Sequence, residues 1–442
     1  MGIYFINDRG RLRNIVKIGD GKMNQAFNPD ALTSIEILNS HGYLAYIVGG
    51  AIRDYFLNCS CVDYDITTNA SLDEICEVFK DYKPKIYANN KCVGIKINET
   101  HLEISAFKGN TIEEDLYNRD FSINSIAYNP RDGFVDPYNG INDIKNKIIK
   151  TINNPVEVIR IDPLRILRAL RFSAIYDMKI DDELEKKLIE LKDLLNLVHP
   201  MRFEHEIDPI FLSNRCSYYI SKYKEIFKVL FKPLIECDGF NQHSKWHIYD
   251  VFNHILKVVD STSNNLVLRL AAFFHDIKKP ECFKPDLDGE GHFPNHYLKS
   301  ANYAKEILEY YSYNHRIVER VYHLVLYHEA RLELDDKMLL EFLVQFGKED
   351  IDLFFELQKA DIMGQNPELL FRLDKYKLIE ERLIYFINNY NLVTYNKLAI
   401  KKNDLILKGY SEAGARRKLI LLATKITKNE LVNDRKELLK II

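Results

Sequence analysis

The sequence has few of the features that mark membrane, secreted or disulfide-stapled proteins. No stretch of the 442 residues approaches the ~18 uncharged apolar residues of a membrane-spanning helix. The seven cysteines include no CxxC pair, which argues against a zinc ribbon or a disulfide framework. The first residues, MGIYFINDRG, lack the basic-then-apolar pattern of a secretion signal. We therefore expect a cytoplasmic protein without a membrane partner.

A strong charge of one sign is also absent. The formal net charge is −3, so the chain as a whole gives no signal of nucleic-acid binding. The charge is uneven, however, because residues 391–442 carry twelve Lys and Arg against five Asp and Glu. Such a segment can neutralise phosphates, but a solvated helix surface has the same composition, and charge alone leaves both interpretations open.

The apolar pattern changes along the chain. Residues 31–150 mix helical segments with short runs of strand type, Leu44–Val48, Val93–Ile97 and Leu102–Ala106, whereas the pattern after about Asn154 is helical almost throughout. This predicts an α+β fold, with a small head that contains a mixed sheet and an extended, mostly α-helical body. Pattern breaks divide the chain into residues 1–152, 153–236, 237–365 and 366–442.

The most informative segment is YIVGGAIRDYFLNCSCVDYDI, residues 46–66. An apolar run ends in Gly49-Gly50 and leads into a helical pattern; glycines allow a ligand to approach the backbone, and free amides at a helix start favour phosphate. Asp63 and Asp65 follow, two residues apart, so that in a strand both carboxylates face one side. Glu103, on the apolar run LEISAF, is the best candidate for a third carboxylate, because a lone acid there needs a partner.

Such carboxylates are typical of phosphoryl transfer with two Mg²⁺ ions. Together with the later segments Asp115–Asn124, Val135–Asp143 and Asp162–Phe172, the chain resembles the bacterial class II tRNA nucleotidyltransferases, which comprise CCA-adding enzymes and poly(A) polymerases. The resemblance implies a polymerase-beta-like head, a neck with a base-selecting helix, and tRNA, CTP and ATP as partners. It makes Asp63, Asp65 and Glu103 catalytic, and it assigns nucleotide binding to Gly49, Gly50, Arg53, Asp54, Arg119, Asp120, Asn124, Asp162, Arg165, Arg168 and Arg171.

Base selection by Asp162 and Arg165 also makes physical sense. Cytosine and adenine each present an amine donor beside a ring-nitrogen acceptor, which an Asp and an Arg match. Guanine and uracil present the opposite order and would leave buried groups unpaired. The two residues are three apart, hence neighbours on a helix. An alternative is that Asp162, which precedes Pro163, simply caps a helix.

Three residues depart from the family pattern: Asn118 and Ile161 stand where an Arg and a Glu are usual, and Met201 replaces another Glu. In addition, only Gly109-Asn110-Thr111 separate the run that ends at Lys108 from the acidic start of the ribose motif. CCA-adding relatives carry a longer mobile loop there, which helps the pocket switch from CTP to ATP, and its loss marks CC-adding members. Addition of C and A is therefore the first prediction, with CC addition or poly(A) synthesis as alternatives.

The middle of the chain resembles the HD phosphohydrolase superfamily. His254, the His275-Asp276 pair and Asp361 match its metal ligands, and His296 and His328 stand where members with two metals have further histidines. Imidazole and carboxylate together suit Mn, Ni, Fe or Zn. Residues 237–365 are therefore expected to be an HD domain with metal-dependent phosphohydrolase activity. An alternative of another class makes this the main activity and the head an RNA-binding module.

The basic end of the chain resembles the tRNA-binding tail of the same enzymes. Arg416, Arg417 and Lys418 are the expected phosphate contacts. The sequence gives no oligomeric state.

Overall fold

The computed structural model describes residues 4–6, 12–14, 27–61, 63–87 and 91–442, so the segment MGIYFINDRG lies largely outside the described residues. The chain forms two compact units. Unit 1 comprises residues 1–214 and 223–230, and unit 2 comprises residues 215–222 and 231–442. Among the described helices, none is long and apolar enough to cross a membrane. The division of the chain into four parts stays a prediction.

Unit 1 contains a seven-stranded mixed sheet with strand order β5-β6-β7-β4-β3-β8-β9. The β4–β7 pair is parallel and every other neighbouring pair is antiparallel. The apolar runs predicted as strands all lie in it, in β3, β6 and β7. Its strands are β3 (Ala45–Val48), β4 (Tyr64–Thr68), β5 (Lys85–Tyr87), β6 (Cys92–Ile97), β7 (Thr100–Ala106), β8 (Ala127–Asn129) and β9 (Gly133–Val135).

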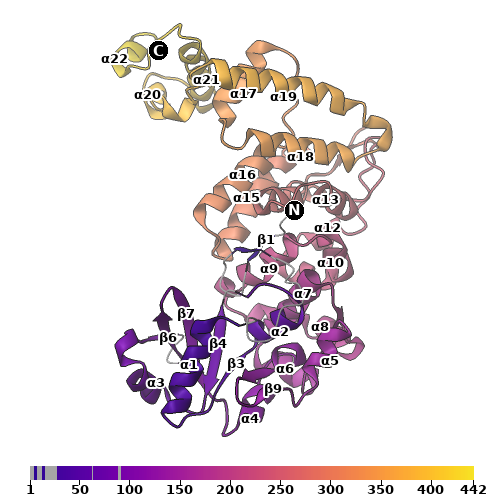
Figure 1. Ribbon diagram of the computed structural model, residues 1–442. Coiled ribbons are helices and arrows are strands. Elements are labelled where there is room, and N and C mark those ends of the chain that lie inside the picture. The colour runs from indigo at the N-terminus through magenta and orange to yellow at the C-terminus, as the bar shows by residue number, and fades with distance from the viewer. Residues whose placement is uncertain (1–3, 7–11, 15–26, 62, 88–90) are drawn as a thin grey trace. The chain divides into compact units, whose positions relative to one another are not determined.

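One face of this sheet is covered by helices and the other carries polar residues. Helices α1 (Pro29–Ser40) and α3 (Leu72–Val78) pack against it (Figure 1). The side chains of Val93, Leu102 and Ile104 on β6 and β7 are accordingly buried. The alternate positions of the same strands, such as Lys96 and His101, are exposed. This period of two is that of a half-covered sheet.

The rest of unit 1 is mainly helical, as the sequence predicts. The further helices are α2 (Gly50–Phe56), α4 (Ile112–Tyr117), α5 (Gly140–Lys145), α6 (Pro155–Ile161), α7 (Arg165–Tyr176), α8 (Asp182–Glu190), α9 (Glu204–Phe211) and α11 (Lys224–Leu230). Two short pairs accompany them, β1 (Tyr4–Ile6) with β2 (Leu12–Asn14) and β10 (Ile148–Ile149) with β11 (Lys179–Ile180). The predicted α+β fold, a mixed-sheet head followed by a mostly helical body, is confirmed.

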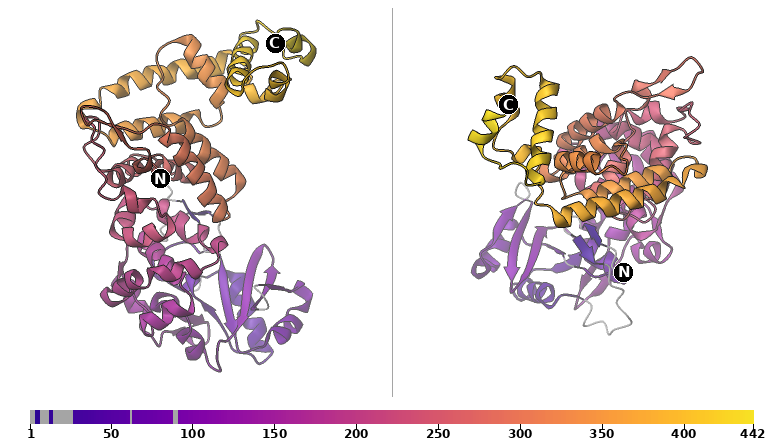
Figure 2. Two further views of the ribbon diagram at one scale, coloured as in Figure 1. Left: turned by 180° about the vertical axis from the view of Figure 1, so that it is seen from behind. Right: turned by 90° about the horizontal axis from the view of Figure 1, so that it is seen from above.

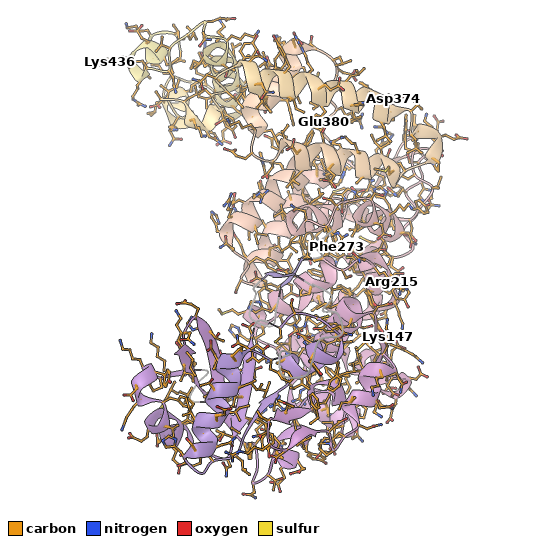
Figure 3. The ribbon with its side chains drawn as sticks, viewed as in Figure 1. Lys147, Arg215, Phe273, Asp374, Glu380 and Lys436 are labelled. Atoms are coloured by element: carbon orange, nitrogen blue, oxygen red, sulfur yellow. The ribbon has the colours of Figure 1, made fainter. Side chains whose placement is uncertain are left out.

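Unit 2 is almost entirely helical. Phe273, labelled in Figure 3, is fully buried, and its ring centroid lies 5.1 Å from that of Phe231. The long helices α18 and α19 run side by side (Figure 2). The helices are α10 (Cys216–Lys222), α12 (Leu234–Cys237), α13 (Val251–Asp260), α14 (Leu266–Phe274), α15 (His296–Tyr310), α16 (His315–Tyr327), α17 (Asp336–Phe346), α18 (Ile351–Met363), α19 (Arg372–Asn389), α20 (Lys402–Ile406), α21 (Glu412–Thr427) and α22 (Arg435–Lys440), and the one hairpin described in this unit pairs β12 (Lys284–Pro285) with β13 (Gly291–His292).

Candidate active and metal sites

The three predicted catalytic carboxylates gather on the open face of the unit 1 sheet. Asp65 on β4 is in register with Glu103 on the parallel strand β7, and with Val48 at the end of β3. Asp63 comes immediately before β4, two residues from Asp65, which places it on the same side by the strand period. Carboxylate oxygens are the ligands that Mg²⁺ prefers, so this donor set fits the predicted magnesium ions.

The turn after β3 brings backbone close to an arginine. Gly49 has φ +71°, a conformation that L side chains rarely adopt. A Cβ at this position would lie only 3.1 Å from Nη1 of Arg119. Glycine is therefore required at position 49 both by the backbone and by the close approach of Arg119. The helix α2 begins directly afterwards, at Gly50.

A polar cavity of about 220 Å³ lies between this turn, β4 and the start of α7. Ten of its lining residues belong to the predicted site, and the other two are Lys108 and Asn118. Five of the lining side chains are cationic and three are carboxylates, as a site for a nucleoside triphosphate requires. The lining residues are Gly49, Gly50, Arg53, Asp65, Lys108, Asn118, Arg119, Asp120, Asn124, Asp162, Arg165 and Arg168.

Two of the predicted nucleotide-binding residues do not line this cavity. Asp54 is fully buried and accepts hydrogen bonds from Arg53 and from the hydroxyl of Tyr176, at 2.9 Å each. Arg171 is 2% exposed and forms an ion pair of 2.8 Å with Glu206. Both side chains lie behind the cavity, where they support its wall.

Arg53 connects the cavity to the helical part of unit 1. Its guanidinium donates to Asn124 at 2.7 Å and lies 4.8 Å from the ring centroids of both Phe172 and Tyr176. Because the group is held on three sides and is 2% exposed, it is fixed in orientation before any ligand binds.

Asp120 is the most strongly held carboxylate of the cavity. Its Oδ1 accepts from the Phe121 amide and from Asn124, and its Oδ2 accepts from Nε of Arg168 at 2.8 Å. Burial raises the pKa of Asp120, but the charge of Arg168 and these hydrogen bonds outweigh it and hold the pKa at about 2. Asp120 is therefore ionised at neutral pH and orients Arg168 along the cavity wall.

The predicted base-reading pair is built differently from the sequence expectation. Asp162 lies in an extended junction between α6 and α7, not within a helix, because Pro163 and the turn after it interrupt the helical path. Its Oδ1 accepts from the Leu164 amide at 3.2 Å and so caps the short turn before α7, whereas the N-cap residue of α7 itself is Leu164, which has no side-chain cap bond. Both of its oxygens also accept from Arg202, at 2.7 and 3.1 Å. Asp162 and Arg165 nevertheless both line the cavity.

Lys108 was not predicted from the sequence. Its side chain lies after β7 and is exposed by surface area, and its pKa is lowered by desolvation, followed by the nearby charge of Arg119. In the sequence, Lys108 directly follows the run LEISAF and precedes Gly109. A lone basic residue at the end of a strand is usually solvated, so the sequence indicated only weakly that Lys108 lines a site.

Unit 2 brings together the predicted HD residues. His254, His275 and Asp276 form one buried group of ligand atoms that all lie within 4.8 Å of one another, and Asp276, His296 and His328 form a second. Asp276 is shared, with Oδ2 3.3 Å from Nε2 of His254 and Oδ1 3.0 Å from Nε2 of His296. Oδ1 of Asp361 lies 3.1 Å from Nε2 of His254. All six predicted residues thus meet at one place.

The orientation of the four imidazoles supports metal binding. Each Nδ1 contacts a backbone carbonyl oxygen, at 3.0 Å for His254, 2.7 Å for His275, 2.8 Å for His296 and 2.7 Å for His328. An Nδ1–H donor at each contact leaves the Nε2 lone pair free for a metal.

Nε2 of His254 and Nε2 of His275 lie only 3.1 Å apart, so that without a metal ion one of the two nitrogens must carry a proton. Oδ1 of Asp276 is, moreover, a buried oxygen with no hydrogen-bond partner among the described residues. Burial lowers the pKa of His254, whereas hydrogen bonds and charges of Asp276 and Asp361 outweigh it and raise the pKa to about 9. A transition metal fits this nitrogen and oxygen donor set.

Two side chains beside this cluster, Lys279 and His247, were not predicted from the sequence. Nζ of Lys279 lies 2.9 Å from Oδ2 of Asp276 and 3.4 Å from Nε2 of His247. Burial lowers the pKa of His247 to about 3, so its ring is neutral at pH 7. The three-residue spacing from Asp276 to Lys279 could have indicated the lysine, because residues three apart are neighbours on a helical turn.

The predicted RNA-binding residues lie on α21. Arg416 and Arg417 are exposed, and Arg416 donates to the hydroxyl of Tyr327 at 3.2 Å. Lys418 is half-buried and donates to the carbonyl oxygen of Ile441. The two arginines keep their charged groups accessible, whereas Lys418 is engaged in holding the end of the chain.

Comparisons with known proteins define the class of the head. Residues 45–150 match the family of poly A polymerase head domains. The chain is 30% identical to poly(A) polymerase I of Haemophilus influenzae over 221 residues, 44% of this chain and 49% of that protein. It is 32% identical to the CCA-adding enzyme of Anoxybacillus flavithermus over 206 residues (43% and 51%) and 35% identical to the CC-adding tRNA nucleotidyltransferase of Shouchella clausii over 158 residues (36% and 42%).

The fold is similar over a longer range. The crystal structure of the Bacillus stearothermophilus CCA-adding enzyme in complex with CTP has a TM-score of 0.62 and 20% identity, covering 93% of this chain and 96% of that one. Residues 45–150 thus match the poly A polymerase head family, and the likeness to the solved CCA-adding enzyme shows that the fold extends over most of the chain. Its sequence match spans about half the length of the curated relatives.

Proposed function

We propose that this protein extends the 3′ end of tRNA by transferring nucleotides from nucleoside triphosphates. The observation that carries the proposal is the register of Asp65 with Glu103 beside the cationic cavity. With Asp63, these carboxylates would hold two Mg²⁺ ions, which supply activation of the attacking hydroxyl and charge neutralisation of the leaving group. The chain's own contribution is to place the triphosphate, since Arg119 and the backbone at Gly49 meet at the same turn.

Base selection would rest on Asp162 held by Arg202. The bidentate pair fixes the plane of the carboxylate. Its Oδ1 also accepts from the Leu164 amide, whereas Oδ2 keeps a second lone pair for an amine donor of cytosine or adenine. Arg165 lies in the same cavity wall and would donate to the ring nitrogen. Guanine and uracil would leave these groups mispaired, at a cost of about 1–3 kcal/mol per group.

The connection after β7 favours restriction to CC addition. The amide of Lys108 donates to Asp115, the amide of Asn110 donates to Glu114, and Asn118 donates to the carbonyl oxygens of Lys108 and Glu114. Gly109 adopts φ +146° against Glu114. These hydrogen bonds hold the short turn against α4. The turn therefore cannot extend across the cavity and change the shape of the cavity for ATP.

The deciding assay offers tRNA that lacks its CCA end together with CTP and ATP. We expect a product that ends in CC. Efficient addition of all three nucleotides would reject the restriction and leave the CCA-adding function, whereas long A tails on unrelated RNA would indicate a poly(A) polymerase. Failure to extend any of these RNAs would reject the proposed function.

A second activity is favoured by the buried cluster of unit 2. Six ligand-type residues with four anchored imidazoles support metal-dependent hydrolysis of a phosphoester or cyclic phosphodiester. A bound Mn, Ni, Fe or Zn ion would supply an activated water. Lys279, within 2.9 Å of Asp276, brings a positive charge to the place where a phosphate would lie.

A further inference from the structure

The open face of the unit 1 sheet continues past the catalytic carboxylates to the edge of the sheet. One row of paired residues crosses four strands: Asp65 on β4 pairs with Glu103 on β7, Glu103 with Gly94 on β6, and Gly94 with Lys85 on β5. Directly paired residues point to the same face of a sheet. The row therefore leads from Asp65 to Lys85 on one continuous surface.

Tyr87 lies on this surface at the edge strand. It is two residues from Lys85 and so faces the same side. Its ring rests against β6 at Gly94, because a Cβ there would be 2.3 Å from Cε2 of Tyr87. No other residue type at position 94 would leave room for the ring in this place. Tyr87 is 49% exposed, so the other side of the ring is open to a ligand.

A cavity of about 750 Å³ covers this region and includes Glu103. The basic residues Lys83, Lys85 and Lys96 line it together with His101, and its acidic lining residues are Asp81 and Glu103. Lys96 also contacts the exposed Glu99 at 2.8 Å. We call the surface formed by Lys85, Tyr87, Gly94 and Lys96 the sheet-edge trough. It combines an exposed ring with cationic side chains and ends at a catalytic carboxylate.

We propose that the sheet-edge trough binds the single-stranded 3′ end of the RNA acceptor, with a base stacked on Tyr87 and phosphates beside Lys85 and Lys96. Aromatic rings and basic side chains along a groove are how proteins hold single strands without reading sequence. Neighbouring strands lie ~4.8 Å apart, so β5 is about 10 Å from β7. This distance suits the nucleotides just behind the reacting 3′-hydroxyl. The inference rests on the proposed function, since it gives the trough its substrate.

The first test compares Tyr87→Ala with Tyr87→Phe in steady-state nucleotide addition. Loss of the ring should raise the KM for tRNA about tenfold and leave the KM for CTP unchanged, whereas Tyr87→Phe, which keeps a stacking surface, should stay within about twofold of wild type. An unchanged KM for tRNA in Tyr87→Ala would overturn the proposal. So would a parallel rise of both KM values, because it would indicate a distorted sheet.

The lysine contacts are tested by salt dependence. Lys85→Gln should reduce the slope of log Kd against log salt concentration by about one for a single-stranded oligonucleotide. The matched control is Lys80→Gln, which removes an exposed lysine that pairs with Glu77 outside the trough. Equal slopes for the two variants would overturn the phosphate assignment.

A binding test separates this inference from the proposed function. The chain has one tryptophan, Trp246, so Tyr87→Trp in a Trp246→Phe background places a single fluorescent ring in the trough. Stacking of a base should quench its emission when an oligonucleotide with a free 3′ end is added. Quenching without any nucleotide addition would refute the proposed function but support the trough. Emission that does not change while tRNA is extended would refute the trough alone.

Discussion

Replacing Asp162 distinguishes the proposed base reading from capping of the turn before α7, because this carboxylate has a contact that fits each role. It accepts from the Leu164 amide just before α7, and it is held by Arg202 in the wall of the polar cavity. Asp162→Asn keeps one side-chain oxygen that can accept from the Leu164 amide but replaces the other oxygen by a donor. Asp162→Ala removes the contacts with both the Leu164 amide and Arg202. The pair of variants therefore isolates the two roles.

The expected changes in nucleotide selectivity and in stability follow from the surroundings of the Asp162 side chain. Mispairing of a buried group with the wrong base costs about 1–3 kcal/mol, or about 5- to 150-fold in selectivity. The Asp162 side chain is 27% exposed and Arg202 is 49% exposed, so water compensates in part and the lower end applies. We expect both variants to lower the preference for CTP over UTP about tenfold. Loss of the cap in Asp162→Ala should in addition destabilise unit 1 by about 1 kcal/mol.

The assay measures kcat/KM for CTP and for UTP on one tRNA acceptor, with urea unfolding as the stability readout. Capping alone would leave the CTP to UTP ratio unchanged in both variants, while only Asp162→Ala loses stability. That result would refute the assignment of Asp162 to base selection. Asp65→Glu should reduce the rate with both nucleotides equally and serves as the control for a general loss of catalysis.

Three further predictions follow from the two sites. Asp63→Ala or Asp65→Ala should abolish incorporation of labelled CTP while tRNA binding in a filter assay persists; normal incorporation would refute the metal assignment. His275→Ala or Asp276→Ala should remove bound transition metal, measured by elemental analysis, and phosphodiester hydrolysis in Mn²⁺ or Ni²⁺, but should leave nucleotide addition intact; wild-type hydrolysis in the variants would contradict this. Asp120, whose pKa of about 2 lies below the ordinary 3.8, should stabilise unit 1 by about 2 kcal/mol above pH 4 and lose this effect as the pH falls to about 2. The loss of unfolding free energy caused by Asp120→Asn, measured with urea, should therefore be largest at pH 7 and should shrink below pH 4. A loss that is equal at pH 7 and pH 3 would exclude the ion pair as its cause.

The carboxylates of the head illustrate how far sequence reasoning reaches. The alternation of Asp63 and Asp65 follows from the strand period, and an acid within LEISAF needs a partner, so each residue could be singled out. The parallel register of Asp65 with Glu103 could not be predicted by the same rules. It depends on which strands pair across 38 residues of chain, and local patterns do not encode that choice.

Family motifs also do not separate residues that line a site from residues that support it. Asp54 and Arg171 belong to the recognised segments, yet both are buried behind the cavity. Asn118 stands at the place of a usual arginine, and here it ties the turn after β7 to α4 through two backbone carbonyl oxygens. Only the three-dimensional contacts reveal that this substitution and the short turn form one structural feature.

The two candidate metal sites differ in their ligands, and this bears on how the chain could run the two proposed reactions. The head offers oxygen ligands on an open sheet face, which would suit Mg²⁺ ions that arrive with a nucleotide. The cluster of unit 2 is buried, and each imidazole is oriented by a carbonyl contact before a metal arrives. Such a preorganised nitrogen-rich site favours a transition metal that remains bound between turnovers. Because the two donor sets differ, each site would select its own metal, and we expect that neither proposed reaction depends on the metal at the other site.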